Sequence, residues 1–326
     1  MRAGYFPELG VAEFRSDMPE PQIRYDKDVK IRIRKCGICG SEVHALHGMH
    51  PFRIPPVLSG HEFAGDVVEV GKGVTKFKPG DRVTGEPQYG CGECYYCKHG
   101  MYNLCTSKRV LGASYKVPEL DNGEWTGSMG EYIVVPEKTV VKLADNVSYE
   151  EGALIEPVAN GIYAVRRANI TPESTVAIIG CGPIGILLMQ SCKALGAAKV
   201  LITDISDYRL ELAKSLGADY AINTAKVPYA DAIAEVFGPD KADVTYECAG
   251  NNATTDMAIQ NSRKGSVIVL VAVFADWAKV DLARLNDSEL TLDTSMMYRH
   301  EDYVDALRFV AEGKIQLKPL ISKHFA

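Results

Sequence analysis

The segment VAIIGCGPIG constrains the fold more than any other, because an apolar run meets three closely spaced glycines there. Gly180, Gly182 and Gly185 form the pattern G-x-G-x-x-G between a predicted strand and a predicted helix. The first glycine permits a tight turn, the second lets a pyrophosphate approach the backbone, and the third lets helix and strand pack closely. The segment therefore predicts a dinucleotide site, with Pro183 and Ile184 of the same turn among its contacts.

The residue that ends the next predicted strand indicates NAD rather than NADP. Asp204 lies 24 positions after Gly180. A carboxylate there can accept hydrogen bonds from both ribose hydroxyls of NAD and would repel the 2′-phosphate of NADP. Taken alone, Asp204 could be a solvated residue at a strand end, and the nearby Arg209 could weaken the preference. We predict NAD(H) as the cofactor and NADP(H) as the less favoured alternative.

Later strand ends are expected to line the same crevice. Glu247 and Gly250, in YECAG, end one predicted strand, and Cys248 and Val271 are counted with the cofactor contacts. Cys248 has no clustered cysteine partner, so it could equally be a small packing residue.

Hydrophobic periodicity divides the 326 residues into two parts of different class. The first 150 or so contain alternating segments such as VKIRIRK and many Gly-rich turns, which predicts an antiparallel, barrel-like β domain. From about Tyr149, apolar strands alternate with amphipathic helices, which predicts a parallel, doubly wound sheet. The run GSVIVLVAV is expected to form an exposed edge strand of that sheet. The predicted fold class is α/β with a second, β-rich domain.

Charge and hydropathy argue against several kinds of partner. The formal net charge is −6, whereas nucleic acid is bound by concentrated Lys and Arg. No apolar run reaches the roughly 18 residues of a membrane span, and the N-terminus lacks a signal pattern. We expect a cytoplasmic protein without nucleic-acid or membrane partners.

Six of the nine cysteines lie in the first third of the chain. Cytosolic thiols are kept reduced, so this clustering indicates metal binding before disulfides. Cys91, Cys94, Cys97 and Cys105 have the spacing C-x2-C-x2-C-x7-C, in which tight turns let four thiolates converge on a tetrahedral zinc ion. An ion with four protein ligands has no open position, so this zinc is expected to be structural. Reactive or paired thiols and a nucleic-acid-binding zinc module are the alternatives, and the latter lacks a basic, aromatic stripe.

A second group of metal-ligating residues lies in GICGSEVH and GHEFAG. Cys39 and His61 supply a thiol and an imidazole 22 residues apart, and both are good zinc ligands, although either could be a buried packing residue. These motifs, together with GDRV, the four-cysteine segment, Glu156-Pro157 and GCGPIG with Asp204, resemble the zinc-dependent medium-chain dehydrogenases. The closest resemblance is to the sorbitol, butanediol and threonine dehydrogenase branch, and it covers nearly the whole chain.

The resemblance implies a domain plan and an assembly. Residues 1–150 and 291–326 would form a GroES-like catalytic domain, and residues 151–290 an NAD-binding Rossmann domain. Two zinc ions per subunit and a homodimer or homotetramer follow from the same resemblance. It also predicts a few dozen further residues after KPLISKHFA.

The resemblance assigns the catalytic zinc to Cys39, His61 and Glu156, and leaves Cys36 as a non-ligand. Glu62 would bind the ion or exchange with water there. A zinc ion with one open position acts as a Lewis acid on an alcohol, which can then pass hydride to nicotinamide.

The proton of the alcohol needs its own route. Ser41 resembles the hydroxyl that accepts it, and His44 resembles the end of the relay, since imidazole titrates near neutral pH. His44 could instead be an ordinary loop histidine.

The implied reaction is reversible oxidation of a secondary alcohol (a polyol, diol or sugar alcohol) to the ketone with NAD(P). An L-threonine 3-dehydrogenase-like enzyme and an inactive nucleotide-binding zinc protein are the alternatives. Tyr298 and Arg299 stand where sorbitol enzymes carry an Arg-Tyr pair, which leaves the substrate open. Glu42 stands where family members usually carry Asp, a carboxylate shorter by one methylene.

Overall fold

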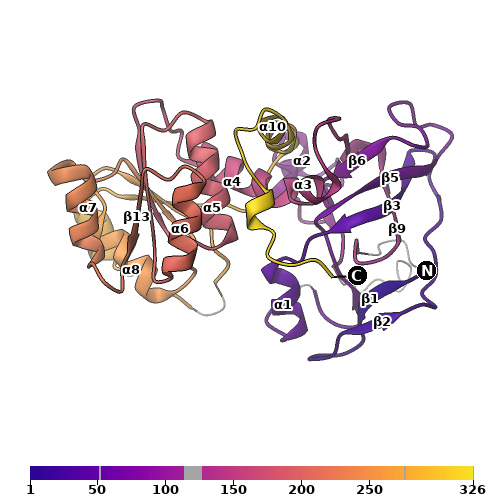
Figure 1. The fold of residues 1–326 in the computed structure, drawn as a ribbon, viewed down its shortest axis with the longest axis horizontal. Helices are drawn as coiled ribbons and strands as arrows, with labels where there is room; N and C mark the ends of the chain where they lie inside the picture. Colours follow the sequence, from indigo (N-terminus) through magenta and orange to yellow (C-terminus); the bar gives the residue numbers. More distant parts are fainter. Residues whose placement is uncertain (51–52, 114–126, 275–276, 326) are drawn as a thin grey trace. The chain divides into compact units, whose positions relative to one another are not determined.

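The computed structural model describes residues 1–50, 53–113, 127–274 and 277–325 (Figure 1). They form two compact units, Met1–Glu156 and Pro157–Ala326, and the chain passes from one to the other inside helix α4 (Ile155–Arg167). Among the described residues, no helix combines the length and apolar character that crossing a bilayer requires.

The first unit is built on an antiparallel sheet of five strands in the order β10-β6-β5-β3-β9. These strands are β3 (Asp28–Cys36), β5 (Phe63–Val70), β6 (Arg82–Gly85), β9 (Tyr132–Pro136) and β10 (Val140–Lys142). In β3, Ile31 is buried while Arg32 and Arg34 are exposed, as the alternation of VKIRIRK predicts. The buried side of the sheet packs around Val29, Ile31 and Phe63.

Shorter elements complete the first unit. A three-stranded sheet contains β1 (Ala3–Phe6), β2 (Glu13–Arg15) and β4 (Val57–Leu58), and β7 (Gln88–Tyr89) pairs with β8 (Arg109–Val110). The helices are α1 (Gly40–Leu46), α2 (Tyr95–Lys98), η1 (Tyr102–Leu104), η3 (Glu137–Thr139) and α3 (Tyr149–Ala153). The predicted β-rich domain is therefore present.

The second unit contains a parallel sheet of six strands in the order β13-β12-β11-β14-β15-β16. Its strands are β11 (Thr175–Ile179), β12 (Lys199–Asp204), β13 (Tyr220–Asn223), β14 (Val244–Glu247), β15 (Val267–Leu270) and β16 (Thr291–Thr294). The chain builds outward from β11 in one direction and then from β14 in the other. The crevice at such a reversal, beyond the carboxyl ends of the strands, is where dinucleotides bind in this class of sheet.

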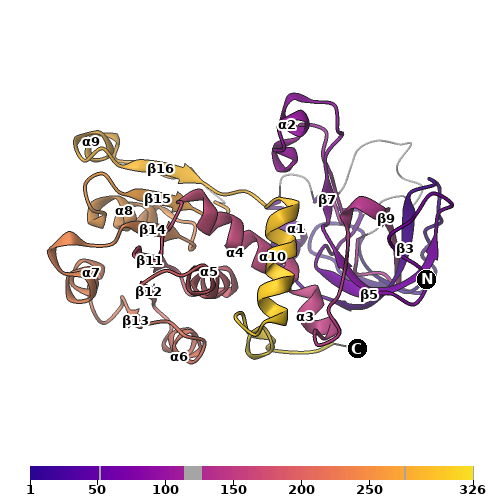
Figure 2. The ribbon, with the colours of Figure 1, turned by 90° about the horizontal axis from the view of Figure 1, so that it is seen from above.

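Helices cover both faces of the six-stranded sheet (Figure 2). The helices that follow α4 in the second unit are α5 (Pro183–Ala194), α6 (Asp207–Ser215), α7 (Tyr229–Phe237), η4 (Gly238–Asp240), α8 (Asn252–Asn261), α9 (Leu282–Asp287), α10 (His300–Ala311) and η5 (Lys318–Leu320). Val176 and Ile178 of β11 pack with α4, α5 and α6. Ala177 and Ile179 pack with α7, α8 and α9. The doubly wound arrangement predicted from the strand and helix pattern is confirmed.

Two predictions differ from the structure at the β16 side of this sheet. The run GSVIVLVAV forms β15, which pairs with β14 on one side and β16 on the other, so it is not an edge strand. Its apolar character reflects an interior strand covered on both faces. Residues 291–326, which the resemblance assigned to the first domain, group with the second unit, because β16 supplies its sixth strand.

Candidate active site

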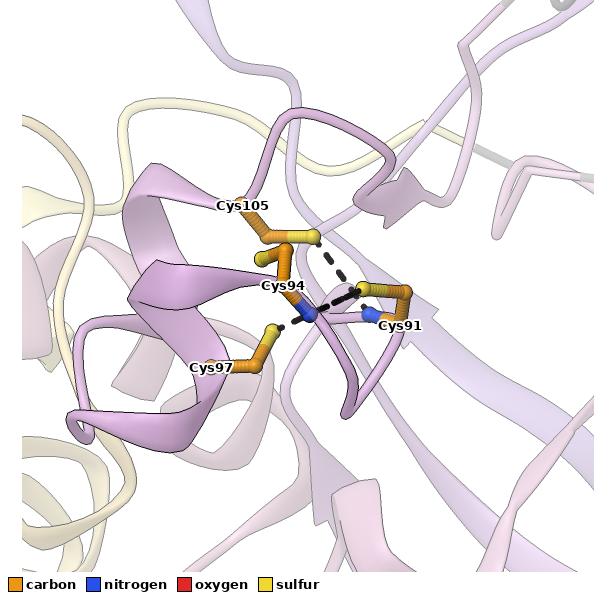
Figure 3. A group of neighbouring side chains, drawn as sticks. All are labelled: Cys91, Cys94, Cys97 and Cys105. Carbon is orange, nitrogen blue, oxygen red and sulfur yellow. Dashed lines mark hydrogen bonds between the residues drawn. The ribbon is translucent and has the colours of Figure 1, made fainter.

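The four clustered cysteines converge as their spacing predicts (Figure 3). Their Sγ atoms all lie within 4.8 Å of one another, and those of Cys91 and Cys97 are 4.0 Å apart. The short helix α2 begins directly after Cys94 and carries Cys97, while η1 leads into Cys105. Zinc–sulfur bonds of about 2.3 Å in a tetrahedron put the sulfurs roughly 3.8 Å apart, so the thiols fit a structural zinc ion.

Backbone amides favour the ionised form of the Cys91 thiol. The amides of Glu93 and Cys94 each donate to the Sγ of Cys91 at 3.4 Å. These hydrogen bonds lower the pKa of Cys91 to about 6. A Cβ at Gly90 would lie only 2.5 Å from the Sγ of Cys97, so the residue before the first ligand must be glycine. The backbone therefore stabilises the thiolate of Cys91, whereas burial raises the pKa of Cys97 to about 12.

The residues of the second predicted group fall into two sets of side chains that share His61, and among the described residues neither set contains both Cys39 and Glu156. Ligand atoms of Cys39, Glu42 and His61 lie within 4.8 Å of one another, and so do those of His61, Glu62 and Glu156. Cys39 immediately precedes α1, His61 and Glu62 immediately precede β5, and Glu156 is in the first turn of α4. One set thus offers a thiol, an imidazole and a carboxylate, and the other an imidazole and two carboxylates, all of them donors that zinc accepts.

Glu42 is part of this cluster, although its role could not be deduced from the sequence. Its Oε1 lies 2.8 Å from Nδ1 of His61 and accepts a hydrogen bond from Ser59 Oγ at 3.2 Å. Its Oε2 accepts from the amide of Cys39 at 2.9 Å. One buried carboxylate thus joins the two predicted ligands Cys39 and His61. The available signal was an acidic residue three positions after Cys39 at the start of a helix.

Burial and neighbouring charges shift the titration of the two residues of the GHE motif. Burial, together with Glu156, raises the pKa of Glu62 to about 7, although His61 acts in the opposite direction. For His61, burial and Arg53 disfavour the charged ring, yet hydrogen bonding with Cys39 and Glu42 raises its pKa well above the usual value. A cation held among these groups would favour the ionised carboxylate.

The segment before α1 is fitted closely to Glu62. A Cβ at Gly37 would lie 2.0 Å from Oε2 of Glu62, and the Gly37 amide donates to the Glu62 carbonyl at 2.9 Å. The Cys36 thiol lies 3.1 Å from Ser128 Oγ, and burial raises its pKa to about 12. Cys36 belongs to neither metal-ligating set of the described residues.

The two residues of the predicted proton relay lie on α1. Ser41 Oγ is buried and makes no hydrogen bond within the described residues, and His44 is half-buried in the last turn. Residues three apart on a helix share a face. The hydroxyl and the imidazole are therefore neighbours on one side of α1.

The glycine motif forms the predicted turn between β11 and α5. Gly180 has φ of +102°, and Gly182 is the N-cap of α5, which begins with Pro183 and Ile184. A Cβ at Gly185 would lie 1.9 Å from the carbonyl oxygen of Gly180. Only glycine permits this close contact between helix and turn, which leaves the amino end of α5 open for a phosphate.

Asp204 ends β12 beside this turn. Its Oδ2 accepts from the Cys181 amide at 2.7 Å, and its Oδ1 accepts from the amides of Ile205 and Ser206 at 2.8 and 2.9 Å. Arg209 is exposed, with Nη1 3.9 Å from Oδ2. The carboxylate is therefore fixed at the strand end where a ribose would lie.

The remaining predicted residues lie in the second unit. Cys248 and Val271 are half-buried and pack against the apolar cluster beneath α5. Tyr298 is fully buried, with its ring centroid 5.6 Å from that of Tyr303. Arg299 is the N-cap of α10. Contact of Cys248 and Val271 with a cofactor stays a prediction.

Comparison with known proteins matches each unit to a described family. The profile of the alcohol dehydrogenase GroES-like domain matches residues 25–145, and that of the zinc-binding dehydrogenase domain matches residues 183–312.

Individual relatives match over most of their length. The L-idonate 5-dehydrogenase of Vitis vinifera is 37% identical over 91% of this chain and 81% of its own. The sorbitol dehydrogenase of Bacillus subtilis is 34% identical over 95% of this chain and 86% of its own. A zinc-binding dehydrogenase of Sinorhizobium meliloti 1021, solved with NADP, is 31% identical with a TM-score of 0.88, covering 98% of this chain and 91% of that one.

Proposed function

The chain belongs to the zinc-dependent medium-chain dehydrogenase/reductase family, and on that premise we propose that it oxidises a secondary alcohol of a polyol or sugar alcohol to the ketone, with NAD as hydride acceptor. The observation that carries the proposal is a pair of donor sets that share the buried His61. In one set a thiol and the carboxylate of Glu42 lie within 4.8 Å of its imidazole and of each other, and in the other set two carboxylates do. The sorbitol and idonate dehydrogenases among its relatives favour a polyol over threonine as the substrate.

Two zinc ions per chain are part of the proposal. Cys39, His61 and Glu156 would hold the catalytic ion with Glu62 beside it, and the four-cysteine loop would hold the structural one. The catalytic ion supplies Lewis-acid polarisation of the substrate oxygen when bound. Thiol, imidazole and carboxylate donors around His61 and four thiols in the loop from Cys91 to Cys105 support this division.

Residues of α1 complete the proposed chemistry. Ser41 Oγ accepts the substrate proton, because this buried hydroxyl has no hydrogen-bond partner within the described residues. His44 lies one helical turn further and can pass a proton to solvent near neutral pH. Glu42 holds His61 through Nδ1, which leaves Nε2 for the metal.

The second unit binds the cofactor in this proposal. The pyrophosphate would bind at the amino end of α5, and Asp204 would accept the ribose hydroxyls of NAD. A related structure holds NADP, so members of the family can use either cofactor. In this chain the preference for NAD over NADP would be set by the carboxylate of Asp204 and by the exposed Arg209.

Assembly and compartment follow the family resemblance. We expect a homodimer or homotetramer. All nine cysteines are free thiols in the structure, which suits a reducing compartment such as the cytoplasm.

A substrate panel tests the proposal directly. Sorbitol, other polyols, small diols, simple secondary alcohols and threonine are offered with NAD or NADP, and reduced cofactor is followed by absorbance. Turnover of polyols with NAD is expected. Reduction of neither cofactor with any member of the panel would reject the proposed function.

The variant Cys39→Ala tests the metal assignment. It is expected to abolish turnover, lower the zinc content from two atoms to one, and leave NAD binding largely intact. Full activity without this thiol would refute the role of Cys39.

A further inference from the structure

Glu247, the last residue of β14, is a fully buried carboxylate at the carboxyl end of the six-stranded sheet. Its Oε1 accepts two hydrogen bonds, from the amides of Ala249 at 2.9 Å and Gly250 at 2.8 Å. Its Oε2 is buried and makes no hydrogen bond within the described part of the chain. Burying a carboxylate with one oxygen unsatisfied is costly, so its place in the sheet calls for a specific role.

The turn that Glu247 holds connects three neighbouring strands. The Cys248 amide donates to the carbonyl of Ile179, the last residue of β11, at 2.8 Å. The Val271 amide, directly after β15, donates to the Glu247 carbonyl at 2.9 Å. Gly250 closes the turn with φ of +74°. The side chain and the backbone of Glu247 therefore fix one short turn at the carboxyl ends of the central strands.

This turn packs directly on the first glycine of the nucleotide motif. A Cβ at Gly180 would lie 3.0 Å from the carbonyl carbon of Cys248 and 3.1 Å from the amide nitrogen of Ala249. β11 and β14 are the two strands between which the sheet order reverses, and the crevice there receives the dinucleotide. Any shift of the Cys248–Gly250 turn is therefore passed to the pyrophosphate turn at Gly180.

We propose that Glu247 is a positioning residue of the dinucleotide site. Its Oε1 holds the turn from Cys248 to Gly250 against Gly180, so the crevice keeps its shape before the cofactor enters. This inference rests on the proposed dehydrogenase function, and it assigns Glu247 no contact with the cofactor. The required property is a hydrogen-bond acceptor at the position of Oε1, which a glutamine can also supply.

Two substitutions at this position separate the acceptor from general packing. Glu247→Ala removes the acceptor for both amides, and the dissociation constant for NADH, measured by calorimetry, is expected to rise at least tenfold. Glu247→Gln keeps a carbonyl oxygen in place, and binding within threefold of wild type is expected. Both proteins should retain the zinc content of the wild type.

Tyr246→Phe is the matched control. It removes a hydrogen bond from the adjacent buried hydroxyl to the Val165 carbonyl at 3.2 Å, so it should lower thermal stability and leave NADH affinity unchanged. If Glu247→Ala does not yield folded protein, Glu247→Asp withdraws the carboxylate by one methylene and should still weaken NADH binding severalfold.

Three results would overturn the inference: wild-type affinity in the alanine or aspartate variant, equal loss in the glutamine and alanine variants, or equal loss in Tyr246→Phe. A wild-type protein that binds neither NADH nor NADPH would instead overturn the proposed function itself.

Discussion

The Oε1 atom of Glu42 lies 2.8 Å from Nδ1 of His61, so a buried carboxylate fixes the imidazole of the proposed zinc site. Removing such a partner of a ligating histidine typically lowers metal affinity by about 10- to 100-fold. We expect Glu42→Ala to release one zinc atom per chain at a chelator concentration that leaves the wild type fully loaded. The zinc of the four-cysteine loop should stay bound, which serves as the internal control. If the variant and the wild type lose zinc at the same chelator concentrations, Glu42 is not needed to hold His61.

Gly37 and Gly40 offer a matched pair of substitutions around the proposed zinc site. An alanine Cβ at Gly37 would lie 2.0 Å from Glu62 Oε2, whereas a Cβ at Gly40 meets nothing within 4 Å. Gly37→Ala should therefore lower turnover by at least tenfold through displacement of Glu62. Gly40→Ala, in the first turn of α1, should keep activity and gain a few tenths of a kcal/mol in stability, up to about 1 kcal/mol. Equal activities in the two variants would contradict the close fit of Gly37 against Glu62.

Cys91 and Cys36 distinguish ligating from non-ligating thiols. Cys91→Ser should reduce zinc from two atoms to one per chain and lower the melting temperature, because the loop loses its metal cross-link. Cys36→Ser replaces a thiol that lies 3.1 Å from Ser128 Oγ, and two zinc atoms should remain. Mass spectrometry of the metal content measures the number of zinc atoms per chain in both variants. Loss of an ion in Cys36→Ser would place that thiol in the metal site.

Asp204 is predicted to set the choice of cofactor. Asp204→Asn keeps oxygen and nitrogen atoms at the strand end but removes the negative charge that would repel a 2′-phosphate. We expect the KM for NAD to rise severalfold and the ratio of kcat/KM for NAD over NADP to fall by about tenfold. Steady-state kinetics with both cofactors measures this ratio. An unchanged ratio would remove Asp204 from the ribose site.

Glu137 gives the first unit a pH-dependent contribution to stability. Its Oε1 accepts from the amides of Thr75 and Lys76 at 2.7 Å, and Lys27 pairs with Oε2 at 3.2 Å. Burial opposes the charged form, yet these hydrogen bonds hold the pKa of Glu137 below its usual value. A lowered folded pKa stabilises the protein above the unfolded value of about 4.3, and the contribution is lost as pH falls through the folded value.

The variant Glu137→Gln isolates this contribution. It should be less stable than the wild type by about 1–3 kcal/mol at pH 7, and the difference should shrink between pH 5 and pH 3. Urea unfolding at a series of pH values measures both. A difference that stays constant over this range would show that the carboxylate charge does not matter.

The main layers of the fold could be predicted because periodicity and turn chemistry are local. β3 alternates in two-residue steps, and the glycine turn before α5 has its own pattern. The place of β15 in the sheet could not be predicted, because an apolar run reads the same in an interior strand and at an edge. Its neighbour β16 is Thr-Leu-Asp-Thr, and a strand with a single apolar residue has no hydrophobic pattern from which it could be predicted.

The candidate site could be predicted only as far as sequence motifs identify residues able to bind a metal. Residue chemistry makes Cys39 and His61 candidate ligands, and the resemblance to the dehydrogenase family adds Glu156. It does not indicate that Glu42 reaches His61, because that contact depends on where α1 begins and how it lies against the segment before β5. The burial of Glu247 is likewise set by the turn after β14, and no periodicity reveals it.

The loop from Cys91 to Cys105 buries only Asn103 and Cys105, so apolar packing contributes little to its shape. If the proposed zinc ion orders this segment, the order depends on the oxidation state of the four sulfurs. Peroxide that converts the ligands of the proposed zinc ion to sulfenic acid or a disulfide would release the ion and disorder this loop, while the apolar clusters of both units stay intact. Such damage would be local, and thiol reductants together with fresh zinc are expected to reverse it.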